Sequence, residues 1–264
     1  MVQCKRQCQN PKSGNPEHPL VVVGLPPIGG VASSASPFVG KVDLFCKMAG
    51  ITYSLETNFG GAGPKGKIPY IRHGDNVLGD STFIIEYLKN TYGDLTKALE
   101  PKTPRDKATA IACQRICEDH LYYGLIHFRF VDQKGYDGTT KFLGGLGLIP
   151  QLLKPIAFRA ARKGIRNTLF TQGLGRHQVE EMKSLLSSSV EALSGFLGDQ
   201  DYMLGAEPSE ADAIVFSTLD NFLNDGNPTA MPELVREFPN LVDYVQRIKD
   251  RFYNSKGTTS VFEN

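Results

Sequence analysis

The stretch SSASPFVGKVDLFCKMAG, residues 33–50, decides how the first half of the chain folds. Ser36 is a favoured helix N-cap, Pro37 suits the first helical position, and apolar residues then recur at helical spacing until Gly50, a common C-terminal stop. A helix is therefore predicted from Pro37 to just before Gly50. A hydroxyl at its start lies among unpaired backbone N–H groups at the positive end of the helix dipole, where an anion or a thiolate is stabilised. On this stretch alone, Ser36 either only caps the helix or also binds an anion.

The composition indicates a folded globular protein, since 264 residues with 41% hydrophobic content can bury a sizeable core. A net charge of +1 gives no overall argument for nucleic-acid binding. No apolar run approaches the length that spans a bilayer, and the first residues lack the apolar segment of a secretory signal, so we expect a cytoplasmic protein. Five scattered cysteines, an odd number, do not predict a disulfide framework and suit a reducing compartment.

The signals up to about residue 95 are those of a small mixed sheet. Residues 1–18 are polar and proline-rich, which predicts a flexible tail, and Cys4 and Cys8 within it are only weak candidates for half of a metal site. Residues 20–23 and 51–55 predict two strands, which with the helix at Pro37 make a strand–helix–strand unit with a parallel strand pair. Residues 68–72 and 76–79 predict a hairpin, and Asp80 and Ser81 begin the next helix.

The glycine-rich loop at residues 58–67 partly matches two nucleotide-binding motifs. Gly61, Gly63 and Gly66 fit G-x-G-x-x-G, and residues 61–67 fit the start of a P-loop. Both motifs need a helix immediately afterwards, because the phosphate binds at the N-terminus of that helix, whereas residues 68–72 predict a strand. A simple loop without a nucleotide is therefore favoured.

From residue 101 the pattern becomes wholly helical. Thr103 to Asp106 form a capping box with Pro104 at the first helical position, which predicts a long helix to about Phe130. Ser209 to Asp212 form a second capping box before an apolar and therefore buried helix. The predicted organisation is a tail at 1–18, one domain at 19–95, an all-helical domain at 101–253 and a loose tail at 254–264.

A basic segment interrupts the balanced charge of the chain. No acidic residue lies between Asp137 and Glu180, and this interval contains Lys141, Lys154, Arg159, Arg162, Lys163, Arg166 and Arg176. Such a segment is either an ordinary solvated face or a patch for an anionic ligand, a membrane surface or a partner protein.

A βαβ–ββα unit followed by an all-helical half resembles the glutathione transferase superfamily, with its thioredoxin-like first domain. Ser36-Pro37-Phe38 with Lys41 resembles the turn that carries the family's thiol-activating residue, and Gly66-Lys67-Ile68-Pro69 resembles the segment at its cis-proline. Asp80-Ser81 resembles the pair that holds the γ-glutamyl end of glutathione, and residues 209–212 resemble the capping box of the second domain. Ser36-Pro37-Phe38 with Lys41, and also residues 172–177, are similar to the metaxin-like branch, which includes failed axon connections proteins.

This resemblance implies a protein that binds glutathione and conjugates its thiolate to a hydrophobic electrophile, without a metal. The implied thiol-activating residue is Ser36, with Ser34 and Ser33 as alternatives, and the implied glutathione-binding residues are Lys67, Ile68, Pro69, Asp80 and Ser81. The electrophile would meet the thiolate in a cleft between the halves, near His120, Tyr122, Tyr123, His127 and Arg176. A homodimer is usual for the fold. The alternatives are a non-catalytic metaxin-like scaffold and a glutathione lyase or isomerase.

Overall fold

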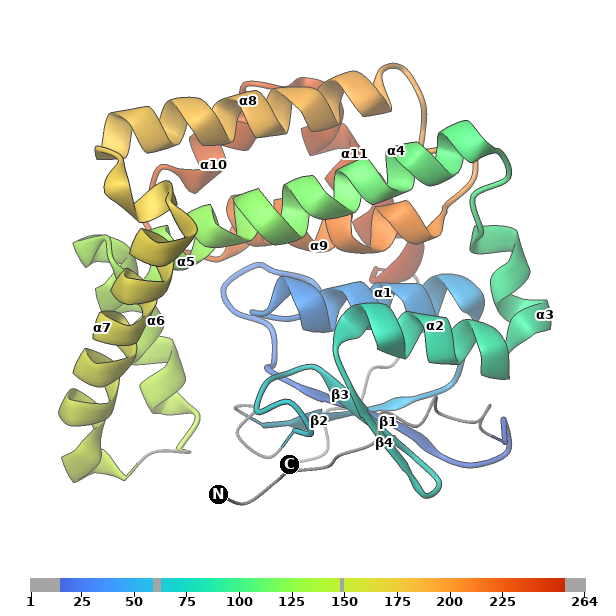
Figure 1. The fold of residues 1–264 in the computed structure, drawn as a ribbon, viewed down its shortest axis with the longest axis horizontal. Coiled ribbons are helices and arrows are strands. Elements are labelled where there is room, and N and C mark those ends of the chain that lie inside the picture. The colour runs from blue at the N-terminus through green and yellow to red at the C-terminus, as the bar shows by residue number, and fades with distance from the viewer. Residues whose placement is uncertain (1–14, 59–62, 148–149, 255–264) are drawn as a thin grey trace.

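In the computed structural model, residues 15–58, 63–147 and 150–254 are described, and the predicted tails at 1–18 and 254–264 lie mostly outside them. The first half is a four-stranded mixed sheet in the order β2-β1-β3-β4, with α1 and α2 packed on the face that meets the helical half (Figure 1). The strands are β1 (Leu20–Gly24), β2 (Ser54–Thr57), β3 (Tyr70–His73) and β4 (Asn76–Gly79). This is the predicted βαβ–ββα order, and the fold class is confirmed.

The strand pairing agrees with the sequence patterns, with small shifts at the ends. β1 and β2 are parallel, with Val22 opposite Leu55, whereas β3 is antiparallel to both β1 and β4. β2 begins at Ser54 rather than at Ile51. β3 begins at Tyr70 rather than at residue 68, since Pro69 has no N–H to donate to a ladder, and the Ile68–Pro69 peptide bond is cis.

Helix α1 (Pro37–Ala49) has the predicted ends, with Ser36 as N-cap and Gly50 in the left-handed conformation as C-cap. One side of α1 packs on the sheet, and the other packs on α9 (Glu210–Asn224) of the second half. The two helices approach closely at Gly40, where a Cβ atom would lie 2.0 Å from Ser217 Oγ and 2.5 Å from Ser33 Oγ. A glycine is therefore needed at this crossing, which fixes the start of α1 relative to the helical half.

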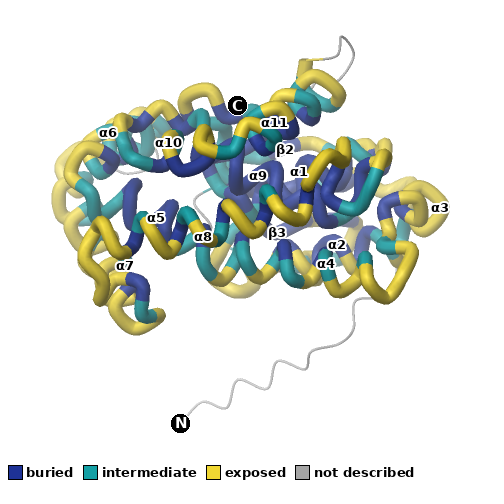
Figure 2. The backbone as a smooth tube through the Cα atoms, turned by 90° about the horizontal axis from the view of Figure 1, so that it is seen from above, coloured by how far each residue is buried: buried dark blue, intermediate teal, exposed yellow. Residues whose placement is uncertain are grey.

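The second half consists of helices packed around α9. Most residues of α9 are buried, as the colouring in Figure 2 shows. The predicted long helix is continuous through α4 (Pro104–Arg115), a π-helical segment η2 (Ile116–Leu121) and α5 (Tyr122–Phe130). The other helices are α2 (Ser81–Thr91), α3 (Gly93–Thr96), α6 (Gln133–Gly145), α7 (Lys154–Gln172), α8 (Val179–Leu197), α10 (Met231–Arg236) and α11 (Pro239–Phe252), with short 3₁₀ turns η1 (Lys97–Leu99), η3 (Gln151–Leu153) and η4 (Leu174–Arg176). No helix in the described parts of the chain is long and apolar enough to cross a membrane.

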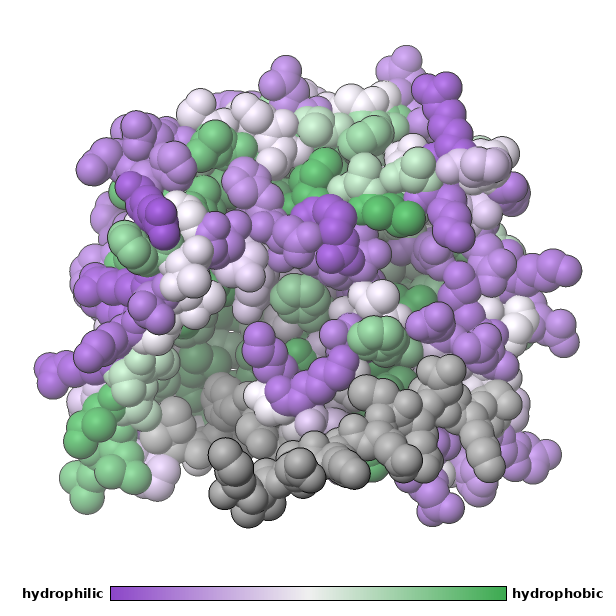
Figure 3. Space-filling model, in the orientation of Figure 1, coloured by the Kyte–Doolittle hydropathy of each residue, from purple (hydrophilic) through white to green (hydrophobic). Residues whose placement is uncertain are grey.

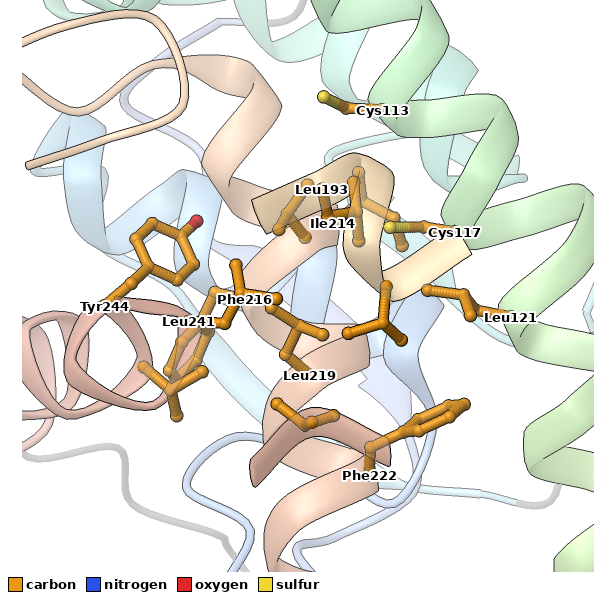
Figure 4. Close-up of a cluster of buried hydrophobic side chains, with 14 of the residues drawn as sticks. Cys113, Cys117, Leu121, Leu193, Ile214, Phe216, Leu219, Phe222, Leu241 and Tyr244 are labelled. Atoms are coloured by element: carbon orange, nitrogen blue, oxygen red, sulfur yellow. The ribbon is translucent and has the colours of Figure 1, made fainter. Parts of the chain in front are cut away.

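The core of the second half surrounds α9 (Figure 4). Phe216, Leu219 and Phe222 project from it among side chains of the neighbouring helices, and Cys113 and Cys117 of the long helix lie in the same cluster. Burial raises the pKa of the Cys113 thiol to about 12, so this cysteine fills space as a protonated thiol.

Candidate functional site

A cavity of about 790 Å³ lies between the two halves, and both contribute to its wall. The first half contributes the start of α1, the loop before β3 and the start of α2. The second half contributes the long helix, α6 and α7. A cavity of this size accommodates a peptide-sized ligand or a drug-sized molecule. The lining residues include Ser36, Phe38, Lys67, Ile68, Pro69, Asp80, Ser81, Tyr122, Tyr123, Ile126, Arg129, Phe142 and Ile165.

The structure places the three predicted serines in different surroundings. Ser36 is half-buried on the cavity wall, and its hydroxyl makes no capping bond to α1. Ser34 is buried, and its hydroxyl donates to the Leu25 carbonyl (2.6 Å) and accepts from the Ser36 amide (3.1 Å). Ser33 is also buried, next to Ser217 at the α1–α9 crossing, where its Oγ has no hydrogen-bond partner. Of the three serines, only Ser36 is among the residues that line the cavity.

Two side chains of the helical half bind the backbone of residues 33–36, which we call the serine turn. Asn221 Nδ2 donates to the Ser34 carbonyl (3.1 Å), and the Arg129 guanidinium donates to the Ala35 carbonyl. The guanidinium is itself held by Asp225 (3.2 Å) and by Asn221 Oδ1 (2.7 Å), and all of these groups are buried. Sequence reasoning missed Arg129 and Asn221. The available signal was a charged or amide side chain within an otherwise apolar helix.

The predicted glutathione-binding residues of the first half meet on one side of the cavity. Lys67, Ile68 and Pro69 precede β3, and Asp80 and Ser81 begin α2 on the neighbouring strand end. These two segments are joined where the Asp80 amide donates to the Pro69 carbonyl (3.3 Å).

Asp80 has an unusual backbone. Among the described non-glycine residues it alone has a positive φ, 85°, and its carboxylate caps α2 by accepting from the Thr82 amide (3.1 Å). Such a conformation is sparsely populated for a residue with a Cβ and occurs often at binding sites. Its other oxygen lies 3.4 Å from Lys65 Nζ, an exposed pair that contributes little to stability. The bond from the Thr82 amide holds the Asp80 carboxylate at the cavity wall.

Aromatic side chains of α1 and the long helix line the cavity together with the charged residues Arg115, Glu118 and Asp119 of that helix. The rings of Phe38 and Tyr122 pack edge to face at 4.8 Å, and Tyr123 lies beside Tyr122 at 5.5 Å. Burial raises the pKa of the Tyr122 phenol, which keeps it protonated near neutral pH. These rings favour a hydrophobic ligand group next to them.

Three residues predicted for the cleft lie elsewhere. His120 faces α8, where its Nδ1 lies 2.7 Å from Ser189 Oγ. His127 is buried, with its ring packed edge to face against Phe128. Arg176 is exposed, stacks on the Phe170 ring at 4.6 Å and donates to the Phe170 carbonyl. Periodicity placed the two histidines on the right helix, but the faces they occupy depend on how that helix packs against α8.

The family models match most of both halves. The model for the glutathione S-transferase N-terminal domain matches residues 37–135, and the model for the glutathione S-transferase C-terminal domain matches residues 186–248. The chain is 33% identical over 240 residues to the isoprene-epoxide–glutathione S-transferase of Rhodococcus sp. (strain AD45), covering 88% of this chain and 99% of that one. The chain belongs to the glutathione S-transferase family.

Other relatives of this glutathione S-transferase family member come from the metaxin-like branch. It is 26% identical to Failed axon connections of Drosophila melanogaster, over 83% of this chain and 55% of that one. It is 24% identical to human Metaxin-2, over 74% of this chain and 73% of that one. Among solved structures, glutathione transferase F2 of Populus trichocarpa superposes with a TM-score of 0.57 at 16% identity, covering 88% and 94% of the two chains, which shows the shared fold.

Proposed function

We propose that this protein binds glutathione and joins its thiol to a hydrophobic electrophile. The observation that carries the proposal is one cavity that combines polar groups, at Ser36, residues 67–69 and Asp80-Ser81, with the aromatic side chains of Phe38, Tyr122 and Phe142. The long helix adds the charged residues Arg115, Glu118 and Asp119 to the same wall. Glutathione is an anionic tripeptide with a free amine, and the cavity offers it Lys67, the backbone of Ile68 and the Asp80 carboxylate. Its cysteinyl sulfur would then lie near Ser36.

The chemistry required of the turn is stabilisation of a thiolate. A free thiol with a pKa near 8.5 is mostly protonated at pH 7, and the thiolate is the nucleophile. A hydrogen bond from the Ser36 hydroxyl and the dipole of α1 both favour the charged form, and a pKa lowered by about two units corresponds to about 2.7 kcal/mol. The Ser36 hydroxyl is available for this bond, since it does not cap the helix.

The electrophile that we propose is a small apolar epoxide or a compound of similar reactivity. The thiolate attacks a ring carbon, a C–S bond forms, the C–O bond breaks, and the alkoxide takes a proton from water. The thiol proton has already gone to solvent, so the reaction is a net addition without an oxidant or a reductant. The support is the aromatic side chains of Phe38, Tyr122 and Phe142, together with the name of the Rhodococcus relative.

A calorimetric titration with glutathione, followed by a conjugation assay with an isoprene-type epoxide and a chromogenic aryl halide, tests the proposal. We expect Ser36→Ala to lower kcat/KM by about 30-fold to 100-fold, on the order of 2 to 2.7 kcal/mol, with the glutathione Kd changed by less than about threefold. Ultraviolet thiolate absorbance should show a higher thiol pKa in the variant. Absence of saturable glutathione binding by the wild type would overturn the proposal.

Ser33→Ala is the matched control. The Ser33 hydroxyl is buried without a partner, and Ser33 does not line the cavity, so removal of this hydroxyl should leave both stability and turnover near wild-type values. If Ser33→Ala and Ser36→Ala reduced turnover equally, the loss would come from disturbance of the turn and not from a missing hydroxyl at the sulfur.

A second candidate function is binding without catalysis, as a scaffold of the metaxin-like kind. The similarity to Failed axon connections and to Metaxin-2 over most of this chain favours it. Saturable glutathione binding with no conjugation of any electrophile tried, and with no effect of Ser36→Ala on thiol pKa, would select this function.

A further inference from the structure

The end of the α6–α7 hairpin carries exposed aliphatic side chains that the cavity does not use. Leu152, Leu153 and Ile156 are 91%, 53% and 67% exposed, and we call these three residues the hairpin tip. Figure 3 shows hydrophobic side chains gathered at the lower left, where Figure 1 places the start of α7 at the end of the helical half. Leucine and isoleucine at such exposure form an apolar patch that water solvates poorly.

A row of positive charge continues from the hairpin tip along α7. Arg159, Lys163 and Arg166 are all exposed, and their spacing puts them on the same helix face as Ile156. We call these three residues the cationic stripe. Two other basic residues of the hairpin point inward instead. Lys154 Nζ donates to the Gly144 carbonyl (2.8 Å), and Arg162 donates to the Val131 carbonyl (2.7 Å).

The surrounding sequence leaves this positive charge uncompensated. No acidic residue occurs between Asp137 and Glu180, although Asp and Glu together number 28 in the chain. An ordinary solvated helix face carries charges of both signs, whereas this interval carries one sign only. The occupant of this surface should therefore be anionic and should also accept three aliphatic side chains.

We propose that the hairpin tip and the cationic stripe bind the surface of an anionic lipid bilayer. At 1.5 Å per residue, Arg159 and Lys163 stand about 4.5 and 10.5 Å above Ile156 along the helix axis. An interfacial segment buries its apolar side chains about 5–10 Å into the boundary between headgroups and acyl chains. With α7 along the membrane normal, insertion of the tip to that depth brings Arg159 and Lys163 to the level of the lipid phosphates, with Arg166 about 15 Å above Ile156 and just outside them.

Charge and area favour a bilayer over a second copy of the chain. Two tips facing one another would bring two cationic stripes together, and like charges repel. A stable protein interface buries about 800 Å² per partner, which is more than three aliphatic side chains supply. In a bilayer the apolar layer lies beneath the anionic phosphates, and in the hairpin the aliphatic tip lies beyond the cationic stripe, so each layer meets its complementary groups.

A tryptophan placed in the tip tests the proposal directly. The chain contains no tryptophan, so Leu152→Trp supplies the only indole signal. Its emission should shift to shorter wavelength with vesicles of phosphatidylcholine and phosphatidylserine at 70:30 in 150 mM salt, and should shift much less with phosphatidylcholine alone. Leu95→Trp is the control, because Leu95 is 51% exposed on α3, away from the hairpin. Equal shifts for both reporters, or no shift at Leu152→Trp, would overturn the proposal.

Vesicle co-sedimentation measures the contribution of the stripe. Each basic residue near an anionic surface contributes about fivefold to binding, so Arg159→Gln/Lys163→Gln/Arg166→Gln should weaken partitioning by about 100-fold. The matched control, Lys97→Gln/Lys102→Gln/Arg105→Gln, removes the same charge from exposed positions around η1 and the start of α4, and should weaken it by less than about fivefold. Equal losses would reduce the effect to net charge and overturn the assignment to the stripe.

The double variant Leu152→Ser/Ile156→Ser tests the hairpin tip itself. Both positions are exposed, so the substitutions should leave the fold intact. We expect at least tenfold weaker binding to the anionic vesicles, with unchanged sedimentation of the lipid-free protein. If that variant instead dissociated an oligomer and left vesicle binding unchanged, the tip would be a surface for self-association and the proposal would fail.

Discussion

Two buried cations connect the halves of this molecule, and they do so in different ways. Lys41 of α1 pairs with Glu118 of the long helix at 2.7 Å, with side-chain exposures of 5% and 9%, so the ion pair itself crosses the boundary. Arg129 pairs with Asp225 at 3.2 Å within the helical half, and only its bond to the Ala35 carbonyl crosses. The first arrangement holds two helices together, whereas the second holds a piece of backbone.

This difference indicates different roles for the two cations. The Lys41 ammonium lies outside the cavity wall and is shared between Glu118 and Thr82, so it acts on how the halves pack. The Arg129 guanidinium lies on the cavity wall and fixes the residue next to Ser36, so it acts on where a ligand atom meets the serine turn. A planar guanidinium held by a carboxylate and an amide is well suited to orienting one carbonyl.

The largest effect is expected for Arg129→Met. Removing the guanidinium leaves the Asp225 carboxylate with 2% side-chain exposure and without its cation, which should cost about 3–5 kcal/mol of unfolding free energy. Glutathione affinity should fall as well, because the serine turn loses its support. Urea unfolding and calorimetric titration check the two parts.

Arg129→Met/Asp225→Leu is the control for Arg129. It removes both charges, so stability should recover partly, while the weakened glutathione binding should persist, since the Ala35 carbonyl still lacks its donor. If glutathione affinity returned together with stability, Arg129 would have no positioning role and would not differ from Lys41 in its effect on the site.

A somewhat smaller loss of stability, about 2–3 kcal/mol, is expected for Lys41→Met. Glu118 would remain paired with Arg115 at 3.2 Å, and that arginine is half exposed, so the carboxylate keeps a solvated partner. In contrast to Arg129→Met, the glutathione Kd should change by less than about threefold. A large rise in Kd for Lys41→Met would show that packing of the halves, and not the serine turn alone, sets ligand binding.

Local signals in the sequence predicted the elements well. Pro37 and Gly50 delimit α1, and the boxes at Thr103 and Ser209 start α4 and α9, because caps act within one turn of helix. The resemblance at Ser36, residues 67–69 and Asp80-Ser81 also pointed to segments that the fold brings to one cavity.

The support of the site could not be predicted in the same way. Arg129 and Asn221 reach the serine turn across about 90 and 190 positions of sequence, and no local pattern encodes such a contact. Likewise, His120 lies on the predicted helix, but that helix packs with His120 toward Ser189 of α8, and His127 is buried on it outside the cavity lining. Periodicity predicts a buried face without saying which neighbour covers it.

Asn221→Ala should cost about 1–3 kcal/mol, since it leaves the Ser34 carbonyl and one guanidinium nitrogen of Arg129 without a buried partner. This change tests the serine turn separately from buried charge, because it disturbs the turn without creating a buried net charge. We expect the turnover of the variant to fall more than its stability alone would explain at a temperature where it remains folded. Asn240→Ala, which removes an amide bonded to the Ser194 carbonyl at 3.1 Å between α8 and α11, is the matched control and should spare turnover.

The smallest effect concerns pH and His127, two residues before Arg129 on α5. Burial lowers the pKa of His127, as does Arg166, against an opposing influence of Asp132. The unfolded chain then binds a proton more readily than the folded one, so stability is fully present above pH 6.5 and is lost as pH falls toward the folded pKa. The slope per histidine is at most about 1.4 kcal/mol per pH unit. Urea unfolding at pH 7.5 and 5.5 should show a smaller acid-induced loss of unfolding free energy for His127→Gln than for the wild type.

His73 and His120, whose pKa values burial also lowers, would account for the remaining acid-induced loss of stability. If His127→Gln also abolished an acid-induced weakening of glutathione binding, protonation at this position would act on the serine turn through Arg129, and the turn would be pH-sensitive as well as ion-supported.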